Sequence, residues 1–236
     1  MNGPRQPPLR TGIGGGEARE STESLARKYA DMSHIDDGRS IDLVLRGLDV
    51  VISGTTLLLL SPLLIVVALA TRLSSGSPVL YKGQRVGRGG HVFEMYKFRT
   101  LAVGAESRLG NTYGQELTRR TDAEVTALGR VLRAVHLDEV PQLLNVLGGQ
   151  MSIVGPRPIR PTFFEEISQR LPQYWQRLAV RPGVTGFAQT RITREDSWDD
   201  KLSHDMEYIA DRSLGLYFRV IFATVARVIV LALRRN

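Results

Sequence analysis

Residues 50–71 read VVISGTTLLLLSPLLIVVALAT, and no side chain in this stretch is charged. A helix of about 20 apolar residues is long enough to cross the hydrocarbon core of a bilayer. A buried core helix is the alternative, because an apolar run by itself does not distinguish the two. The stretch therefore predicts one long apolar helix, and we interpret it as a membrane helix.

Two features argue against a simple crossing of the bilayer. Ser61 and Pro62 stand in the middle of the stretch, where a proline removes a helical hydrogen bond and predicts a kink. Basic residues lie on both sides, with Arg46 before the stretch and Arg72 after it, and positive charge favours the cytoplasmic side of a membrane. Residues 39–73 are therefore expected to form a kinked re-entrant helix that enters and leaves the cell (inner) membrane by its cytoplasmic face.

The rest of the chain divides into three parts. Residues 1–38 are rich in Gly, Pro and Ser without an apolar period, which predicts a disordered tail. Residues 74–215 are assigned to a catalytic domain, and residues 216–236 to an amphipathic C-terminal helix. Arg219 and Arg227 fall roughly on one face of that helix. Two alternatives stay open for it, a position in the membrane surface and packing onto the core of the domain.

Short strands are expected within the catalytic domain. Residues 78–100 predict a β-hairpin with its turn at 87–90, and residues 151–154 predict a further short strand. On a strand, Lys97 and Arg99 would share one face, where two cations could clamp a phosphate. An ordinary solvated strand face is the alternative. The fold class is thus predicted as α+β, helix-dominated with a small β-hairpin, in a monotopic membrane protein.

The overall composition limits the classes of function. The formal net charge is +7 and there is no cysteine. Anionic partners are expected, whereas a disulfide framework, a thiolate metal site and a cysteine nucleophile are excluded. Nucleic-acid binders gather their basic residues with aromatic ones or carry a known fold, but here the basic residues flank an apolar segment. No nucleic acid is therefore expected as a partner.

The residues that could carry chemistry are an acidic pair and two arginines held by prolines. Asp138 and Glu139 come shortly before a proline, where an acidic pair is usually only a helix-start feature. Arg157 stands between two prolines, and Arg181 precedes Pro182. A rigidly held guanidinium matches the geometry of a phosphate with little loss of entropy. Together these residues favour chemistry on phosphates.

The sequence resembles the bacterial sugar transferase family, the monotopic polyprenyl-phosphate phosphoglycosyl transferases, in a minimal form. The resemblance runs from about residue 46 to the C-terminus. Its markers are Ser61-Pro62, Tyr96-Lys97-Phe98-Arg99-Thr100, the block from Asp138 to Pro158, the run from Arg181 to Gln189, and Lys201-Leu202 with Asp205 and Tyr208. Val135-His136 stands where the family often has a hydroxyl residue before the acids, and this leaves the identity of the sugar open.

This resemblance implies a reaction in two steps. Asp138 would attack a nucleoside diphosphate sugar, usually a UDP-sugar in the family, forming a sugar-phosphate-aspartyl intermediate and releasing the nucleoside monophosphate. Undecaprenyl phosphate, a polyprenyl phosphate, would then accept the sugar phosphate. Such a reaction initiates polysaccharide or glycoconjugate synthesis, as in exopolysaccharide biosynthesis. A non-catalytic membrane scaffold is the second alternative, and the intact acidic pair argues against it.

The same resemblance assigns roles to individual residues. Mg²⁺ is expected with Glu139 and Asp138 as its protein ligands, because this ion keeps oxygen ligands and bridges phosphates. Phosphate or substrate binding is expected of Lys97, Arg99, Arg157, Arg181, Gln189 and Asp205. For Asp205 a helix salt bridge is an equal alternative, and Gln189 could instead close a turn. Membrane lipids are expected partners, and whether the chain forms a homo-oligomer stays open.

Overall fold

A computed structural model of the chain describes residues 40–105, 108, 121–191 and 197–233. The predicted tail at residues 1–38 lies outside this part of the chain. The described helices are α2 (Ser40–Ser75), α5 (Ala127–Ala134), α6 (Gln142–Leu147), α7 (Pro161–Arg170), α8 (Phe187–Arg191), α9 (Trp198–Asp211) and α10 (Leu214–Leu233). Three 3₁₀ helices join them: η1 (Arg88–Gly90), η2 (Leu137–Glu139) and η3 (Pro172–Ala179). The strands are β1 (Leu80–Val86), β2 (Val92–Phe98), β3 (Ser152–Val154) and β4 (Gly183–Thr185).

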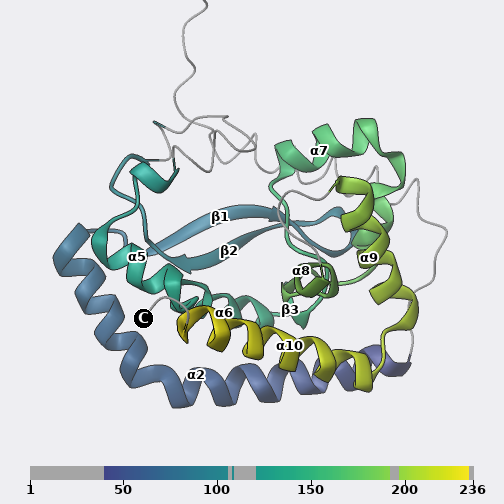
Figure 1. Ribbon diagram of the computed structural model, residues 1–236, viewed down its shortest axis with the longest axis horizontal. Helices are drawn as coiled ribbons and strands as arrows, with labels where there is room; N and C mark the ends of the chain where they lie inside the picture. The colour runs from purple at the N-terminus through teal and green to yellow at the C-terminus, as the bar shows by residue number, and fades with distance from the viewer. Residues whose placement is uncertain (1–39, 106–107, 109–120, 192–196, 234–236) are drawn as a thin grey trace, which may run out of the picture.

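Helices dominate the structure and surround a small β-hairpin, which confirms that part of the predicted fold class (Figure 1). Strands β1 and β2 pair antiparallel, from Leu80 opposite Phe98 to Val86 opposite Val92. Their connection needs glycine, because Gly89 and Gly90 have φ angles of 64° and 79°, a region that other residues avoid. The predicted hairpin and its turn are therefore confirmed.

A second, smaller sheet consists of β3 and β4, which pair in parallel. The strand expected at residues 151–154 is confirmed as β3. Its partner β4 was not predicted, because a strand of three residues among glycines has no alternating pattern to reveal it. This sheet brings the segment that follows Asp138 and Glu139 next to the segment that follows Arg181.

Helix α2 is continuous over 36 residues although Pro62 lies inside it. A proline has no N–H for the carbonyl four residues earlier, which here is Leu58. The Ser61 hydroxyl donates a hydrogen bond of 2.8 Å to that carbonyl and replaces the missing donor. In Figure 1 the helix runs along the lower edge of the molecule and turns upward at the left. A kink centred on Pro62 and a re-entrant position stay predictions.

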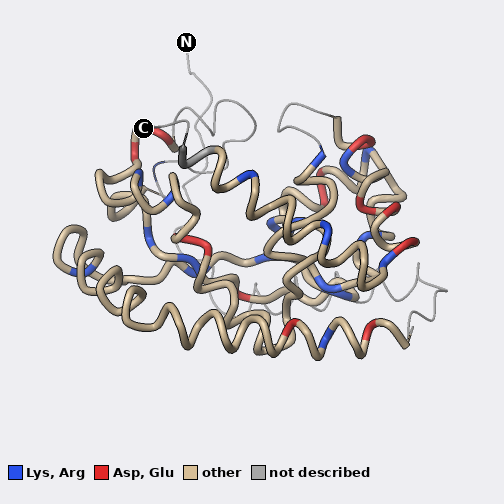
Figure 2. Tube along the Cα trace, turned by 60° about the horizontal axis from the view of Figure 1, so that its bottom comes forward, with Lys and Arg blue, Asp and Glu red and all other residues tan. Residues whose placement is uncertain are grey.

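The surface of α2 does not fit the alternative of a buried core helix. It is the one helix among the described residues that is long and apolar enough to cross a membrane, and 11% of its most apolar stretch is buried. Leu58, Leu59 and Leu73 are 74%, 73% and 86% exposed. Figure 2 shows the charged positions of α2 near its ends, with a long uncharged stretch between them.

The N-terminal half of α2 is nevertheless joined to the rest of the molecule. Buried Asp49 accepts hydrogen bonds from the Ser152 hydroxyl (3.0 Å), the Ile153 amide (2.9 Å) and the Tyr217 hydroxyl (2.9 Å). These contacts connect α2 to β3 and α10. One side of α10 packs on the core through Tyr217, while Phe222 on the same helix is 68% exposed. One side of the C-terminal helix therefore packs onto the core of the domain, and the other side leaves a position in the membrane surface open as a prediction.

Candidate active site

The acidic pair lies in η2, and the residue before it has an unusual backbone. His136 has a φ of 56°, the one positive φ at a residue other than glycine in the part of the chain described. Such angles are uncommon outside glycine and are enriched at functional sites. The chain then turns so that Asp138 is buried, with 8% exposure, while the Glu139 side chain is 22% exposed.

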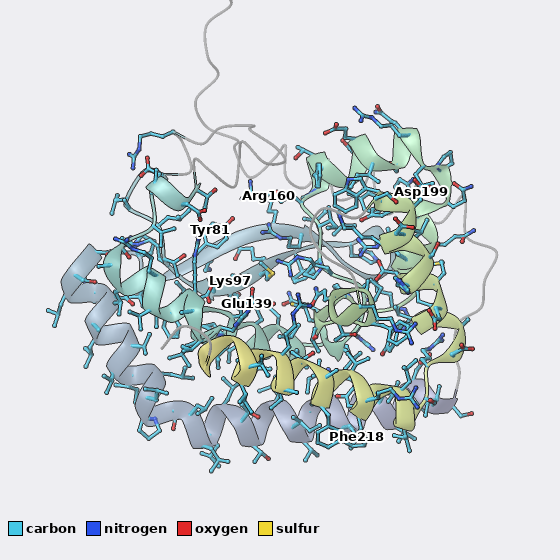
Figure 3. All side chains as sticks on the ribbon, viewed as in Figure 1. Tyr81, Lys97, Glu139, Arg160, Asp199 and Phe218 are labelled. Atoms are coloured by element: carbon cyan, nitrogen blue, oxygen red, sulfur yellow. The ribbon has the colours of Figure 1, made fainter. Side chains whose placement is uncertain are left out.

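The two carboxylates differ in their partners. The Lys97 ammonium on β2 donates to Glu139 Oε1 at 2.5 Å, and Figure 3 shows these two side chains close together near the middle of the molecule. The Asp138 carboxylate accepts no hydrogen bond from any residue that the structure describes. One acid is thus held by a cation, whereas the lone pairs of the other are free for a reaction.

Electrostatics separates the two acids further. Burial raises the pKa of Asp138, and the neighbouring charge of Glu139 raises it as well, against the opposite effects of Lys97 and Arg133. Burial acts in the same direction on Glu139, but the charges of Lys97 and Arg157 hold the pKa of Glu139 below its ordinary value. Glu139 is therefore the stable anion, and Asp138 is the more basic carboxylate.

A cavity of about 190 Å³ opens beside Glu139. Its charged lining consists of Lys97, Glu139, Arg85, Arg157 and Arg160. With four cations and one anion, this cavity suits a group that carries several negative charges, such as a diphosphate. We call it the basic pocket. Figure 3 shows Arg160 above the pair of Lys97 and Glu139.

Arg85 and Arg160 were missed by the sequence analysis. A signal for Arg85 existed, because the hairpin pairs Arg85 with Phe93 and thereby places it on the strand face that carries Lys97. No comparable pattern marks Arg160, which precedes α7 in an irregular segment.

Tyr81 holds Arg85 through an arrangement that depends on a glycine. A Cβ atom at Gly83 would lie 2.5 Å from the Tyr81 hydroxyl and 2.8 Å from its ring, so the ring lies directly over the bare backbone. The hydroxyl is hydrogen-bonded to Arg85. Tyr81, Gly83 and Arg85 occupy one face of β1, so the tyrosine lies along the strand and positions the arginine.

Asn145 on α6 fixes the acidic pair relative to the hairpin. Its side-chain oxygen accepts from the Tyr96 amide at 2.9 Å, and its side-chain nitrogen donates to the Glu94 carbonyl at 2.7 Å. Since β2 carries Lys97 and η2 leads directly into α6, these bonds keep Lys97 opposite Glu139.

The two loops in which prolines hold an arginine pack against each other. A Cβ atom at Gly155 would lie 2.4 Å from the Arg181 carbonyl, and one at Gly183 would lie 2.2 Å from the Gly155 nitrogen, so both positions require glycine. The two guanidinium groups nevertheless diverge. Arg157 lines the basic pocket, whereas Arg181 donates from Nε to the Gly149 carbonyl at 2.8 Å and lines a separate cavity.

Arg99 is not brought into the basic pocket. Strand β2 ends at Phe98, so the alternation that would place Arg99 beside Lys97 does not continue. The Arg99 guanidinium instead donates to the carbonyls of Ser75 and Gly76, the latter at 2.8 Å. These carbonyls end α2, where a cation is favourable. The expected clamp of Lys97 and Arg99 on one strand face is therefore not formed.

Asp205 forms the salt bridge that was the alternative for it. Arg177 lies 2.7 Å from the Asp205 carboxylate, and both side chains are 5% exposed. Arg177 also donates to the Arg157 carbonyl at 3.0 Å, so this buried ion pair supports the loop that carries Arg157. Gln189 lies in α8 and does not line the basic pocket; its backbone carbonyl accepts from Arg227 at 2.6 Å.

A metal ion would have few protein ligands in this site. The described residues contain no group of three or more His, Cys, Asp or Glu side chains suited to a metal. Mg²⁺ is commonly bound by one or two carboxylates together with phosphate oxygens of the substrate. The adjacent carboxylates of Asp138 and Glu139 fit that mode of binding, in which the substrate supplies the remaining ligands.

Comparison with known proteins gives one family. A family model described as "Bacterial sugar transferase" matches residues 41–231. This range contains every described helix and strand except the ends of α2 and α10.

Curated relatives carry names that describe sugar phosphate transfer. The chain is 36% identical over 187 residues to a UDP-N-acetylgalactosamine-undecaprenyl-phosphate N-acetylgalactosaminephosphotransferase from Aeromonas hydrophila, which covers 78% of this chain and 43% of the relative. It is 39% identical over 191 residues to a UDP-glucose:undecaprenyl-phosphate glucose-1-phosphate transferase from Caulobacter vibrioides, with 79% and 70% covered. It is 38% identical over 197 residues to an exopolysaccharide production protein from Rhizobium leguminosarum, with 78% and 95% covered. The chain thus spans less than half of the first relative and most of the other two.

Proposed function

Because the chain belongs to the bacterial sugar transferase family, we propose that it moves a sugar 1-phosphate from a nucleoside diphosphate sugar to undecaprenyl phosphate. The curated relatives support a UDP-sugar as donor and undecaprenyl phosphate as acceptor, since both occur in their names. They differ in the sugar, so the proposal leaves the sugar open. The product would be the first lipid-linked intermediate of a polysaccharide or other glycoconjugate.

The observation that carries this proposal is the contrast between Glu139, which lines the basic pocket, and the adjacent Asp138, which does not line it. Glu139 is paired with Lys97, whereas Asp138 is buried without a hydrogen bond from any described residue. A carboxylate can act as a covalent catalyst for phosphoryl groups when nearby cations offset the repulsion between two anions. Lys97, Arg85, Arg157 and Arg160 are suited to that task.

In the first step, a carboxylate oxygen of Asp138 attacks the phosphorus that bears the sugar. A new bond forms between Asp138 and this phosphorus, and the bond from phosphorus to the bridging oxygen of the diphosphate breaks. The bridging oxygen leaves with the nucleoside monophosphate and takes the electron pair with it. The cations of the basic pocket stabilise the charge that develops on the phosphoryl oxygens.

In the second step, a phosphate oxygen of undecaprenyl phosphate attacks the same phosphorus. The bond between Asp138 and phosphorus breaks, the carboxylate is restored, and the lipid diphosphate sugar is released. The two substrates use one site in turn, so neither the bulky nucleotide nor the lipid has to be accommodated together with the other.

Glu139 and Asp138 would hold Mg²⁺ together with the diphosphate oxygens, and when bound this ion supplies Lewis-acid neutralisation of the phosphates. In that arrangement Lys97 orients Glu139, because its ammonium already holds one oxygen of the carboxylate.

The reaction would take place at a membrane. The exposed apolar surface of α2 supports its position as a re-entrant helix in the cell (inner) membrane, with the catalytic residues on the cytoplasmic face. The exposed apolar side of α10 could lie in the membrane surface beside it.

The test is a transfer assay on the membrane fraction, with undecaprenyl phosphate and a panel of radiolabelled nucleotide sugars. At least one UDP-sugar is expected to give a labelled lipid product. Asp138→Asn should abolish this product, Glu139→Gln should lower it severely, and chelation with EDTA should stop the reaction. Full turnover by Asp138→Asn would reject Asp138 as nucleophile, and turnover in EDTA would reject the role of Mg²⁺.

A further inference from the structure

A second cavity, of about 440 Å³, lies beside the turn of the hairpin. The turn contributes Arg88, Gly89 and His91, and the opposite wall contains Gly149 and Arg181. No residue lines both this cavity and the basic pocket. It therefore requires an explanation of its own.

Two guanidinium groups, those of Arg88 and Arg181, line this second cavity, and a third, that of Arg46, lies beside its Gly149 wall. Arg46 on α2 donates to the carbonyls of Val146 (2.6 Å) and Leu147 (3.0 Å) at the end of α6. Its Nη2 would lie 3.6 Å from a Cβ atom at Gly149, and Arg181 Nε is bonded to the Gly149 carbonyl, so both arginines flank this glycine. Arg88 faces them across the cavity from the hairpin turn.

The carboxylates that act on this cluster, Asp49 and Asp42, lie outside the cavity. No Asp or Glu side chain lines the cavity. The nearest acids have other partners: Asp42 is 2.7 Å from Arg212, and Asp49 accepts from Tyr217 and β3. Burial lowers the pKa of Arg181, and the charges of Arg46 and Arg88 lower it further, against the opposite effects of Asp49 and Asp42.

Hydrogen-bond donors also remain available in the cavity. Within the described ranges, the Arg88 guanidinium and the two terminal nitrogens of Arg181 donate to no protein acceptor. Arginine presents paired N–H groups that match the oxygens of a phosphate. Gly87, Gly89 and Gly149 also line the cavity.

We propose that this second cavity binds the phosphate group of a membrane lipid, at a site separate from the one where the donor reacts. The lipid is favoured over free phosphate because Arg46, which lies beside the Gly149 wall of the cavity, belongs to α2, the helix whose apolar surface is exposed. A lipid held there would reach α2 with its acyl chains while its phosphate meets the arginines. The inference rests on the membrane position of α2 given under the proposed function, and it does not depend on the transfer reaction.

Titration of the full-length protein in detergent with dihexanoyl phosphatidic acid and with inorganic phosphate tests this site. Arg88→Ala should weaken binding of the lipid by about tenfold, because it removes one charge-assisted contact. Arg130→Ala is the matched control, since Arg130 is an exposed arginine on α5 that does not line the cavity. The Arg130→Ala variant should bind the lipid as tightly as the unaltered protein does.

The two probes distinguish the source of the phosphate. Tighter binding of the lipid than of inorganic phosphate supports the lipid, whereas equal binding with the same dependence on Arg88 would overturn that assignment in favour of a free anion. Equal affinity of Arg88→Ala, Arg130→Ala and the unaltered protein for both probes would overturn the site itself. Asp138→Asn should bind the lipid normally while losing transfer, so failure of this inference and failure of the proposed function are separable.

Discussion

At the level of single residues, the site depends on two neighbouring carboxylates in different surroundings. Lys97 and Arg157 stabilise the charge of Glu139, so this acid stays ionised and can orient a cation or a phosphate. Asp138 is buried, and the charge of Glu139 makes its ionisation harder still. A carboxylate of raised pKa is a stronger nucleophile once it is ionised, at the cost of being protonated more easily.

The pH dependence of transfer should reveal this coupling. In the proposed mechanism the attacking form of Asp138 is ionised. Activity should therefore be present above the pKa of Asp138 and be lost as the pH falls through it, at a higher pH than for an ordinary aspartate. Glu139→Gln removes a negative charge, so the loss of its residual activity on the acid side of the pH profile, the acid limb, should move to lower pH. Lys97→Met removes a positive charge and should move it to higher pH.

Rates measured across the acid range for both variants check this prediction. Arg130→Ala, which changes the charge of an exposed residue on another element, should leave the acid limb in place. Superimposable pH profiles for all three variants and the unaltered protein would contradict the assignment of the limb to Asp138.

Tyr81 and Gly83 give a second prediction about single residues. Tyr81→Phe removes the hydroxyl that positions Arg85 and should raise the KM for the donor by about tenfold or more, as expected for one lost hydrogen bond to a charged group, with kcat largely kept. Gly83→Ala should have a similar effect because the new methyl group would displace the tyrosine ring.

A double-mutant cycle tests the physical link between these two residues. In a Tyr81→Ala background there is no ring to displace, so Gly83→Ala should add little. Lys82→Ala is the control, since Lys82 lies on the other face of β1 and pairs with Glu94. Additive effects of the two substitutions would show that the glycine has some other role.

The sequence predicted part of this site and missed part of it for identifiable reasons. Lys97, Glu139 and Arg157 do come together. They could be predicted because each belongs to a motif or a proline-held loop that can be recognised in the local sequence. Arg85 was missed because its position on the strand face of Lys97 depends on the register of the hairpin. Asp205 is neutralised by Arg177, a contact between η3 and α9 that no local pattern contains.

At the level of secondary-structure elements, α6 and β2 are joined by the side chain of Asn145. This residue is completely buried and bonds to the Tyr96 amide, the Glu94 carbonyl and the Gln150 side chain. A buried amide of this kind specifies one relative position of two elements, because any shift leaves polar groups unpaired.

Asn145→Ala should therefore destabilise the protein by about 1–3 kcal/mol, the cost of leaving buried polar groups without partners. Thermal unfolding in detergent measures the effect as a lower Tm. Gln150→Ala removes one exposed partner of the same amide and should cost clearly less. A Tm for Asn145→Ala equal to that of Gln150→Ala would contradict the role given to Asn145.

The elements themselves were predictable where their periodicity or composition was strong. The hairpin, the apolar helix α2 and the helix that became α10 followed from such patterns. Strand β4 could not be predicted, since its pairing with β3 is a long-range contact between two strands of three residues each.

At the level of the whole molecule, one helix connects the exposed apolar surface to the candidate catalytic residues. Asp49 and Asp42 on the N-terminal half of α2 bind β3, α10 and the end of α9. Arg99, the residue that follows β2, caps the C-terminal end of the same helix. Both ends of α2 are therefore attached to the domain, and its exposed apolar part lies between them.

This arrangement predicts that both ends of α2 lie on the same side of the membrane. Single cysteines introduced at positions 40 and 78 should both be protected from an impermeant thiol reagent added to intact cells, and both should react after permeabilisation. The chain contains no cysteine of its own, so labelling reports only the introduced site. Reaction at one of the two positions in intact cells would show instead that the helix crosses the bilayer.

The central claim for the whole molecule is that Asp138 becomes covalently attached to the sugar phosphate in the course of the reaction. Mass spectrometry of the enzyme incubated with its donor in the absence of undecaprenyl phosphate tests this most directly. The account predicts a peptide carrying a phosphosugar on Asp138, which disappears when the acceptor is added and never forms in Asp138→Asn. An active enzyme that shows no such adduct, or shows it on another residue, would contradict the account.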